Sequence, residues 1–137
     1  MLAATPMVWL RAQWRAFQLG AQRPAATQEA QLRSLLRQAA STRFGRDHGF
    51  DAIATVAEFQ DRVPLRRFED FWDDYWQHDF PRLQDCTWPG VIPYFAKTSG
   101  ATTGITKFIP CSREILDASQ RASWDVLYFH LLNHPAS

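Results

Sequence analysis

The chain has 137 residues, of which 46% are hydrophobic and 21% charged, and this is the composition of one folded domain rather than of a disordered, collagen-like or low-complexity protein. The net charge is +1, yet residues 1–46 carry seven arginines and one acidic residue, whereas residues 47–85 carry four arginines and ten acidic residues. The arginines fall within amphipathic helical patterns. We therefore expect the two segments to complement each other within one fold, and we expect no nucleic-acid partner.

The sequence also argues against secretion and against a membrane partner. Arg11 and Arg15 interrupt the apolar stretch near the N-terminus, so it has no signal-peptide pattern, and no uncharged run is long enough to span a bilayer. Cys86 and Cys111 lack metal-ligand spacing, and we interpret them as buried reduced thiols. These features predict a cytoplasmic protein without a metal site of its own.

Hydrophobic spacing predicts two helices in the first third of the chain. Apolar residues recur at helical intervals over residues 6–19, and Gly20 is expected to end this helix. A second helix is predicted from a cap at Thr27 to about Ser41. Residues 41–50 are predicted to form a loop, in which glycines permit turns.

A capping box and an aromatic stripe predict the next two helices. Thr55 and Glu58 have the spacing of a capping box, which predicts a short helix that ends before Pro64. The clearest helix is predicted over 67–78, where five aromatic side chains form one stripe: Phe68, Phe71, Trp72, Tyr75 and Trp76. We expect this stripe to be core, and a contact face for a partner or an aromatic ligand is the alternative. The acidic side opposite is interpreted as a solvated face, with no pair of catalytic carboxylates: Glu69, Asp70, Asp73 and Asp74.

Beyond Gly90 the pattern changes to short segments of β-branched and aromatic residues. Strands are predicted over 91–98 and 106–110, and a last helix is predicted from Ser112 to just before Asn133. The predicted fold is therefore mostly α-helical with one β-hairpin.

The segment between the two strands is the candidate binding site. It runs from Lys97 to Lys107, the only two lysines in the chain, and it contains five hydroxyl side chains and two glycines. Backbone amides, hydroxyls and an ammonium together suit a polyphosphate. The spacing is that of neither a Walker A loop nor a GxGxxG motif, and composition alone favours a surface turn over a binding loop.

The order of these residues carries a family resemblance. TSGATTGITKFIP resembles the first ATP-binding motif of the adenylate-forming superfamily. Four blocks, in this order, resemble the N-terminal part of the auxin-responsive Gretchen Hagen family of acyl acid–amido synthetases: STRFGRDHGF, VPLRRFED, PGVIPYFAKTSG and KFIP. The resemblance extends from about residue 28 to 120, and it implies the α/β fold of that family. The chain would then be a partial N-terminal portion of the synthetase domain, covering 1–137, with the C-terminal domain absent.

The resemblance implies a ligase that uses ATP and Mg²⁺. A small carboxylic acid is joined to the α-phosphate of ATP, and an amino acid then displaces AMP to form an amide. The resemblance assigns no catalytic residue in this chain. It assigns phosphate binding to Thr98, Ser99, Gly100, Thr102, Thr103, Gly104 and Lys107. Ala101 stands where the family usually has a hydroxyl residue, and this removes one hydrogen-bond donor at a cost of about 1.5–3 kcal/mol.

Two functions remain open at this stage. The family's adenine, ribose and acyl motifs are not found in these residues, so the first interpretation is a fragment that is inactive on its own. The alternative is a stand-alone helical interaction or binding module derived from the family. The last helix distinguishes them, because a fragment should leave its apolar side partly uncovered and a self-contained module should bury it.

Overall fold

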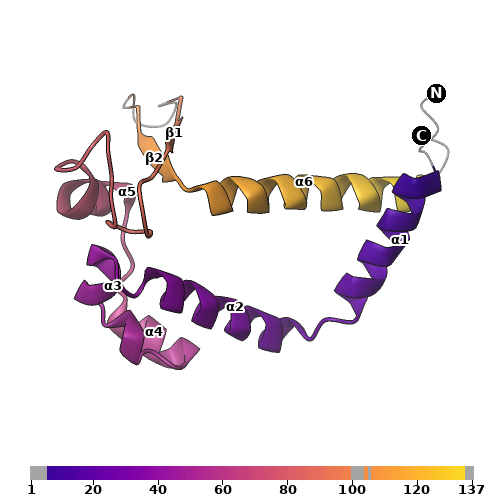
Figure 1. Ribbon diagram of the computed structural model, residues 1–137, viewed down its shortest axis with the longest axis horizontal. Coiled ribbons are helices and arrows are strands. Elements are labelled where there is room, and N and C mark those ends of the chain that lie inside the picture. The colour runs from indigo at the N-terminus through magenta and orange to yellow at the C-terminus, as the bar shows by residue number, and fades with distance from the viewer. Residues whose placement is uncertain (1–5, 100–103, 105, 135–137) are drawn as a thin grey trace. The chain divides into compact units, whose positions relative to one another are not determined.

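The computed structural model describes residues 6–99, 104 and 106–134. The chain divides into two compact units, one formed by residues 1–24 with 113–137 and the other by residues 25–112. Helices predominate, and two strands pair as an antiparallel sheet (Figure 1). The predicted fold, mostly helical with one hairpin, is confirmed.

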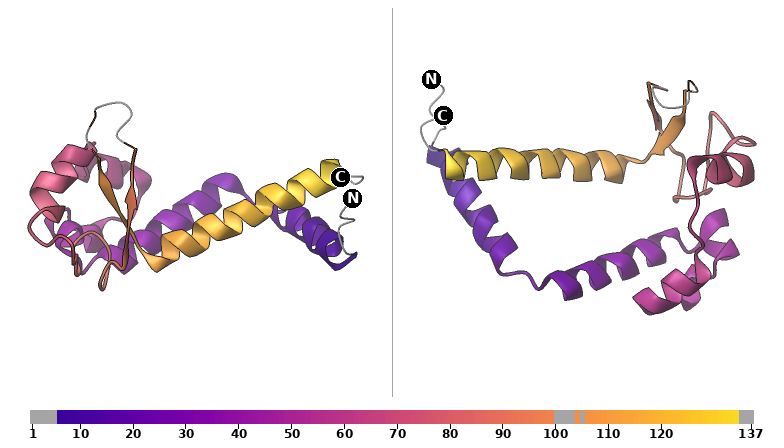
Figure 2. Two further views of the ribbon diagram at one scale, coloured as in Figure 1. Left: turned by 90° about the horizontal axis from the view of Figure 1, so that it is seen from above. Right: turned by 180° about the vertical axis from the view of Figure 1, so that it is seen from behind.

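The first unit is a pair of packed helices, α1 (Pro6–Gly20) and α6 (Arg113–Asn133). Figure 2 shows the beginning of α1 beside the end of α6. Nε and Nη2 of Arg15 donate to the two carboxylate oxygens of Asp125 over 2.7 and 2.8 Å, which ties the helices together. Both helices lie within about a residue of their predicted bounds.

Most large apolar side chains of this unit are exposed. Trp14, Phe17 and Val126 are 61%, 67% and 72% exposed, and no described residue of α6 is buried. Each helix of a pair covers only the side of the other helix that it contacts, so the remaining apolar surface of both stays exposed. Among the described helices, none is both long and apolar enough to cross a membrane.

The second unit contains the remaining elements. In chain order they are α2 (Pro24–Ala39), α3 (Arg43–Asp47), the 3-10 helix η1 (Phe50–Ala52), α4 (Val56–Arg62), α5 (Phe68–Phe71), the π-helical turn η2 (Trp72–Trp76), β1 (Tyr94–Lys97) and β2 (Phe108–Cys111). Helix α2 begins at Pro24 and not at the predicted cap Thr27. Proline suits the first helical position, because the amide N–H that it lacks would have no partner within the helix.

The core of this unit gathers side chains from most of its elements. Its buried members are Leu36, Ala39, Phe44, Phe50, Ile53, Tyr75, Leu83, Cys86 and Ile92. Phe44 lies at the centre of an aromatic group, with ring centroids 5.6 Å from Phe50, 5.3 Å from Phe71 and 5.2 Å from Tyr75. The aromatic stripe therefore contributes to the core, as predicted, through Tyr75 and Phe71.

Helix α3 lies inside the segment predicted to be a loop, so that prediction was wrong. The first amides of a helix have no partner within it, and here two of them find partners far along the chain. Arg43 N–H donates to the carbonyl of Asp85 over 2.8 Å, and Phe44 N–H donates to the carbonyl of Cys86 over 2.9 Å. These contacts support a helix that local sequence alone does not specify.

Gly45 serves close packing rather than a turn. Thr42, the N-cap of α3, is fully buried; its hydroxyl donates to the carbonyl of Ala39 over 2.7 Å and accepts from Gly45 N–H over 3.0 Å. A Cβ added at Gly45 would lie 2.0 Å from that same Ala39 oxygen. Gly49, in contrast, has a φ of 60° and makes the turn that was predicted for it.

The predicted capping box is confirmed at the start of α4. Glu58 N–H donates to Thr55 Oγ1, and Thr55 N–H donates to a Glu58 carboxylate oxygen, each over 3.2 Å. The helix ends at Arg62, before Pro64, as predicted. Because all these partners lie within one turn of each other, sequence was sufficient to locate this helix.

The helix predicted over 67–78 contains a π turn. Gln77 N–H donates over 2.9 Å to the carbonyl of Trp72, five residues earlier. The wider turn alters the direction of the side chains that follow it. Tyr75 is buried in the core, whereas Trp72 is only half-buried, so the single predicted stripe divides between two environments.

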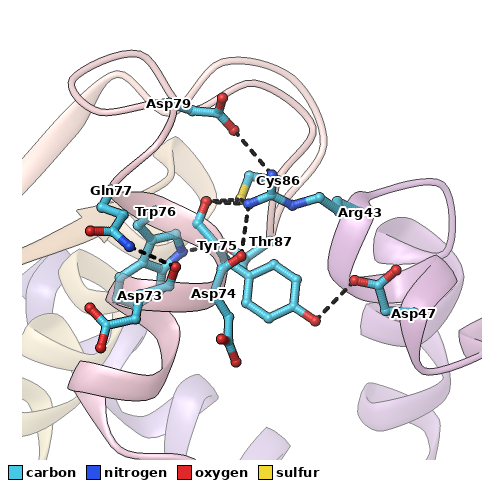
Figure 3. A network of polar contacts seen from close by, with 10 residues as sticks. All are labelled: Arg43, Asp47, Asp73, Asp74, Tyr75, Trp76, Gln77, Asp79, Cys86 and Thr87. Carbon is cyan, nitrogen blue, oxygen red and sulfur yellow. Dashed lines mark hydrogen bonds and ion pairs between the residues drawn. The ribbon is translucent and has the colours of Figure 1, made fainter.

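A polar network joins α3 to η2 and to the segment after it (Figure 3). The Arg43 guanidinium donates to the carbonyl of Tyr75, and it lies 3.6 Å from the carboxylate of Asp79. Tyr75 O–H donates to Asp47 over 3.0 Å. Burial, with this hydrogen bond, raises the pKa of Tyr75 to about 12, and burial also raises the pKa of the Cys86 thiol. The neutral Tyr75 and Cys86 side chains are therefore buried in the network, whereas the carboxylates of Asp47 and Asp79 lie at its exposed edge.

Candidate functional site

The predicted hairpin is present, and its last pairing brings together the two ends of the candidate loop. Strands β1 and β2 pair with Lys97 opposite Phe108. One step further, Thr98 N–H donates to the carbonyl of Lys107 over 3.1 Å, and Lys107 N–H donates to Thr98 Oγ1 over 3.1 Å. The pairing of the two strands therefore continues one step beyond them, to Thr98 and Lys107.

The residues predicted to bind phosphate are only partly described. Thr98 is half-buried, and its hydroxyl, which accepts a bond, has its own hydrogen to donate. Ser99 and Gly104 are exposed, and Gly104 has a φ of 69°, a conformation that favours glycine. The other three predicted residues lie outside the described residues: Gly100, Thr102 and Thr103.

Lys107 contacts helix α5, which the sequence did not indicate. Its ammonium nitrogen lies 2.5 Å from Oε1 of Glu69 and 5.0 Å from the ring centroid of Phe68. The Lys107 side chain is 26% exposed and that of Glu69 57%. The hydrogen bond from Lys107 is the main cause that lowers the pKa of the Glu69 carboxyl. The ammonium is therefore paired with a carboxylate and rests on an aromatic face.

These residues border a pocket of about 390 Å³ between the helix and the hairpin. Its lining residues are Phe68, Glu69, Trp72, Asp73, Phe80, Thr106, Lys107 and Phe108. Phe80 connects the two sides, with its ring centroid 5.4 Å from that of Trp72 and 5.4 Å from that of Phe108. The pocket has aromatic walls and charged groups at its edge, which is the usual construction of a site for an organic molecule.

The acidic face of the predicted helix is exposed, as expected, but its members have specific partners. Asp70 accepts from the backbone N–H of Arg67 over 2.7 Å at the start of α5, and Asp74 pairs with Arg66. Glu69 pairs with Lys107 from the hairpin. Among the described residues, no group of three or more His, Cys, Asp or Glu side chains is placed to hold a metal ion. Cys86 is buried and Cys111 is half-buried, and both are free thiols.

The family follows from the comparison with known proteins. A family model described as the GH3 family N-terminal domain matches residues 13–135. The chain belongs to the GH3 family. The match includes the second half of α1, all of α6 and all of the second unit, so it covers more of the chain than the four blocks that carry the resemblance in sequence. No curated protein and no solved structure matches the chain.

The hairpin of this GH3 chain makes contacts that sequence reasoning missed. Glu69 and Trp72 were interpreted as parts of a solvated face and a core stripe. Both line the pocket beside Lys107. The signal that could have indicated this was the scarcity of lysine, since a chain that otherwise uses only arginine has two lysines next to this loop.

Proposed function

We propose that this chain forms the nucleotide-phosphate site of an ATP-dependent acyl acid–amido synthetase. The observation that carries the proposal is the GH3 match over residues 13–135, together with a hairpin that closes the Thr98–Lys107 segment at its two ends. The two hydrogen bonds between Thr98 and Lys107 hold these residues in place. Residues that are already held in place lose less entropy when they bind a ligand.

In the proposed reaction the loop acts on the phosphates of ATP. The carboxylate of an acid attacks the α-phosphorus, pyrophosphate leaves, and the amine of an amino acid then attacks the acyl carbonyl and releases AMP. Thr98, Ser99 and the loop residues Gly100, Thr102, Thr103 and Gly104 would donate hydrogen bonds to the β- and γ-phosphates. Lys107 would add a positive charge beside them. The chain would thus contribute by positioning and charge stabilisation.

Magnesium fits this proposal as part of the nucleotide. The segment between Thr98 and Lys107 contains hydroxyls and amides but no carboxylate. These groups suit phosphate oxygens better than a hard cation, which prefers oxygen ligands that carry charge. Mg²⁺ would therefore arrive with ATP, held by phosphate oxygens and water, and would neutralise part of the phosphate charge.

Nucleotide binding by the 137-residue chain is the first test of the proposal. We expect the wild type to bind ATP weakly and in a Mg²⁺-dependent manner in equilibrium dialysis. Lys107→Ala should lower the affinity at least fivefold, because a cation beside the phosphates is lost. Ser99→Ala removes one candidate donor and should have a smaller effect. Binding that is equal in the wild type and in Lys107→Ala would reject the site.

Pyrophosphate exchange with a panel of carboxylic acids is the second test. These residues contain phosphate donors but no recognised adenine or acyl motif, so we expect little acid-dependent exchange from them alone. In longer relatives with this loop, Lys107→Ala should impair exchange. Acid-dependent exchange by the 137-residue chain, well above its Lys107→Ala control, would show instead that it is an enzyme by itself. Action in the cytoplasm, without nucleic-acid or membrane partners, belongs to the same proposal.

A helical interaction module is the second candidate function, in which the exposed apolar side chains of the first unit would form the contact surface. The uncovered apolar side of α6 itself is what the first interpretation, a fragment, predicts. Trp14, Phe17 and Val126 are more than half exposed in the first unit. Size-exclusion chromatography with light scattering would detect self-association through these residues. A monomer whose mass does not change in Trp14→Ser would argue against this candidate.

A further inference from the structure

Lys107 already has an anionic partner, and this has a consequence for the nucleotide site. Its ammonium lies 2.5 Å from the Glu69 carboxylate, and its side chain is only 26% exposed, against the ring of Phe68. An ion pair in this position cancels most of the charge that Lys107 would present to a phosphate. A phosphate must therefore either displace Glu69 or bind beside it.

Both possibilities weaken phosphate binding. If Glu69 is displaced, the energy of the ion pair and of its alignment on Phe68 is lost. If Glu69 stays, a phosphate oxygen bonded to the same nitrogen would lie within about 5 Å of the carboxylate, and two negative charges at that distance repel each other. The site is partly exposed, so solvent and salt reduce this repulsion without removing it.

We propose that Glu69 competes with polyphosphate for Lys107 and thereby sets the nucleotide affinity of the hairpin. This inference rests on the proposed function. It assigns to Glu69 the role of an internal anion that occupies the lysine until a more highly charged ligand replaces it. A triphosphate competes better than a single phosphate, because it carries more negative charge and can accept from the Thr98 hydroxyl beside Lys107 as well. The pair thus selects for polyphosphates.

The variant Glu69→Gln tests the competition. It keeps the size of the side chain and removes its charge. We expect ATP to bind about three- to tenfold more tightly than to the wild type in equilibrium dialysis, a gain in the range of a partly exposed ion pair. Asp73→Asn is the matched control, because Asp73 borders the same pocket and carries the same charge. It should change the affinity by less than about twofold.

The expected gain must also depend on Lys107. In a Lys107→Ala background, Glu69→Gln should improve binding no more than Asp73→Asn does. A gain from Glu69→Gln that persists in that background would overturn the competition. Tighter binding of inorganic phosphate and of ATP by the same factor would overturn the selection for polyphosphates.

Lysine chemistry gives a readout that does not depend on nucleotide. The chain has two lysines, Lys97 and Lys107, so acetylation followed by mass spectrometry reports on each separately. Lys97 is exposed, whereas Lys107 is paired and half-buried. We expect Lys107 to react more slowly than Lys97 in the wild type. Glu69→Gln should accelerate Lys107 at least threefold and leave Lys97 unchanged, because the ion pair holds the Lys107 nitrogen against α5 and restricts its access to the reagent.

These outcomes separate the inference from the function on which it rests. If the wild type binds ATP and Glu69→Gln binds it no more tightly than Asp73→Asn does, the inference fails and the proposed function stands. If neither the wild type nor Glu69→Gln binds ATP, both fail. If only Glu69→Gln binds, both are supported. Equal acetylation of Lys107 in the wild type and in Glu69→Gln would show that the pair does not form in solution, and would overturn the inference by itself.

Discussion

Gly45→Ala should destabilise the second unit, although helix propensity predicts the opposite. Alanine inside a helix is favoured over glycine by about 1 kcal/mol. The added Cβ, however, would lie 2.0 Å from the carbonyl oxygen of Ala39, 2.9 Å from its carbonyl carbon and 3.0 Å from the carbonyl oxygen of Ala40. Favourable contacts between heavy atoms begin at about 3.5 Å, so α3 must move by about 1 Å or more relative to the end of α2.

The size of the effect follows from what has to move. The atoms that clash are backbone, and the Thr42 hydroxyl fixes the same carbonyl of Ala39. Overpacking of this kind costs about 1–3 kcal/mol, and a backbone neighbour places the cost near the upper end. After the gain in propensity, the free energy of unfolding should fall by about 2 kcal/mol. For a unit of this size the melting temperature should fall by about 10 °C.

Thermal and urea unfolding, followed by far-ultraviolet circular dichroism, measure this change. Gly20→Ala is the matched control: it makes the same substitution at the end of α1, where a Cβ would meet nothing within 4 Å. It should leave the melting temperature unchanged or raise it slightly. If Gly45→Ala melts at or above the temperature of the wild type, the close approach of α3 to the end of α2 is refuted.

Three further predictions concern the two units. Tyr75→Phe should lower the free energy of unfolding by about 1–2 kcal/mol, because it removes the hydrogen bond to Asp47. Since the pKa of Tyr75 is raised from 10 to about 12 in the folded state, the stability of the wild type in urea should fall as pH rises from 10 to 12, and the stability of Tyr75→Phe should fall less. Trp72→Ala should lower the free energy of unfolding by about 1–3 kcal/mol in urea, less than the roughly 3–5 kcal/mol expected for a fully buried aromatic residue, because Trp72 borders a pocket. A loss as large as that of Tyr75→Ala would contradict this prediction. A double-mutant cycle on Arg15 and Asp125 should give a coupling free energy of about 0.5–1 kcal/mol at neutral pH. Because Arg15 lowers the pKa of Asp125 in the folded state, the coupling is complete above the pKa of Asp125 in the unfolded chain and is lost as pH falls through its pKa in the folded state. A coupling that is unchanged in acid would reject the ion pair.

The elements that sequence predicted are those whose partners are close in sequence. Thr55 and Glu58 satisfy each other's amides within one turn, so the start of α4 could be located from four residues. The hairpin was predicted because β-branched and aromatic residues follow Gly90 on either side of a short hydroxyl-rich segment. Helix α3 could not be predicted in this way. Its first amides are satisfied by carbonyls of Asp85 and Cys86, whose proximity depends on the whole unit.

The candidate site shows the same division. The loop and Lys107 could be identified from residue types and order alone. The pairing of Lys107 with Glu69 could not, because it depends on how the hairpin packs against α5. The π turn added a second difficulty: a period of 3.6 residues assigns Trp72 and Tyr75 to one face, whereas the wider turn places one beside the pocket and the other in the core.

The partners of the α3 amides also have a consequence for the order in which the chain folds. The amides of Arg43 and Phe44 have no carbonyl partners until the ribosome has made Asp85 and Cys86, so the N-terminal turn of α3 cannot be completed before then. Until then a five-residue helix is too short to persist in water. The Thr42 side chain, fully buried in the folded unit, is therefore solvated until those two residues have been made. Once residues 85 and 86 are available to accept these hydrogen bonds, α3 can complete its first turn and pack into the core.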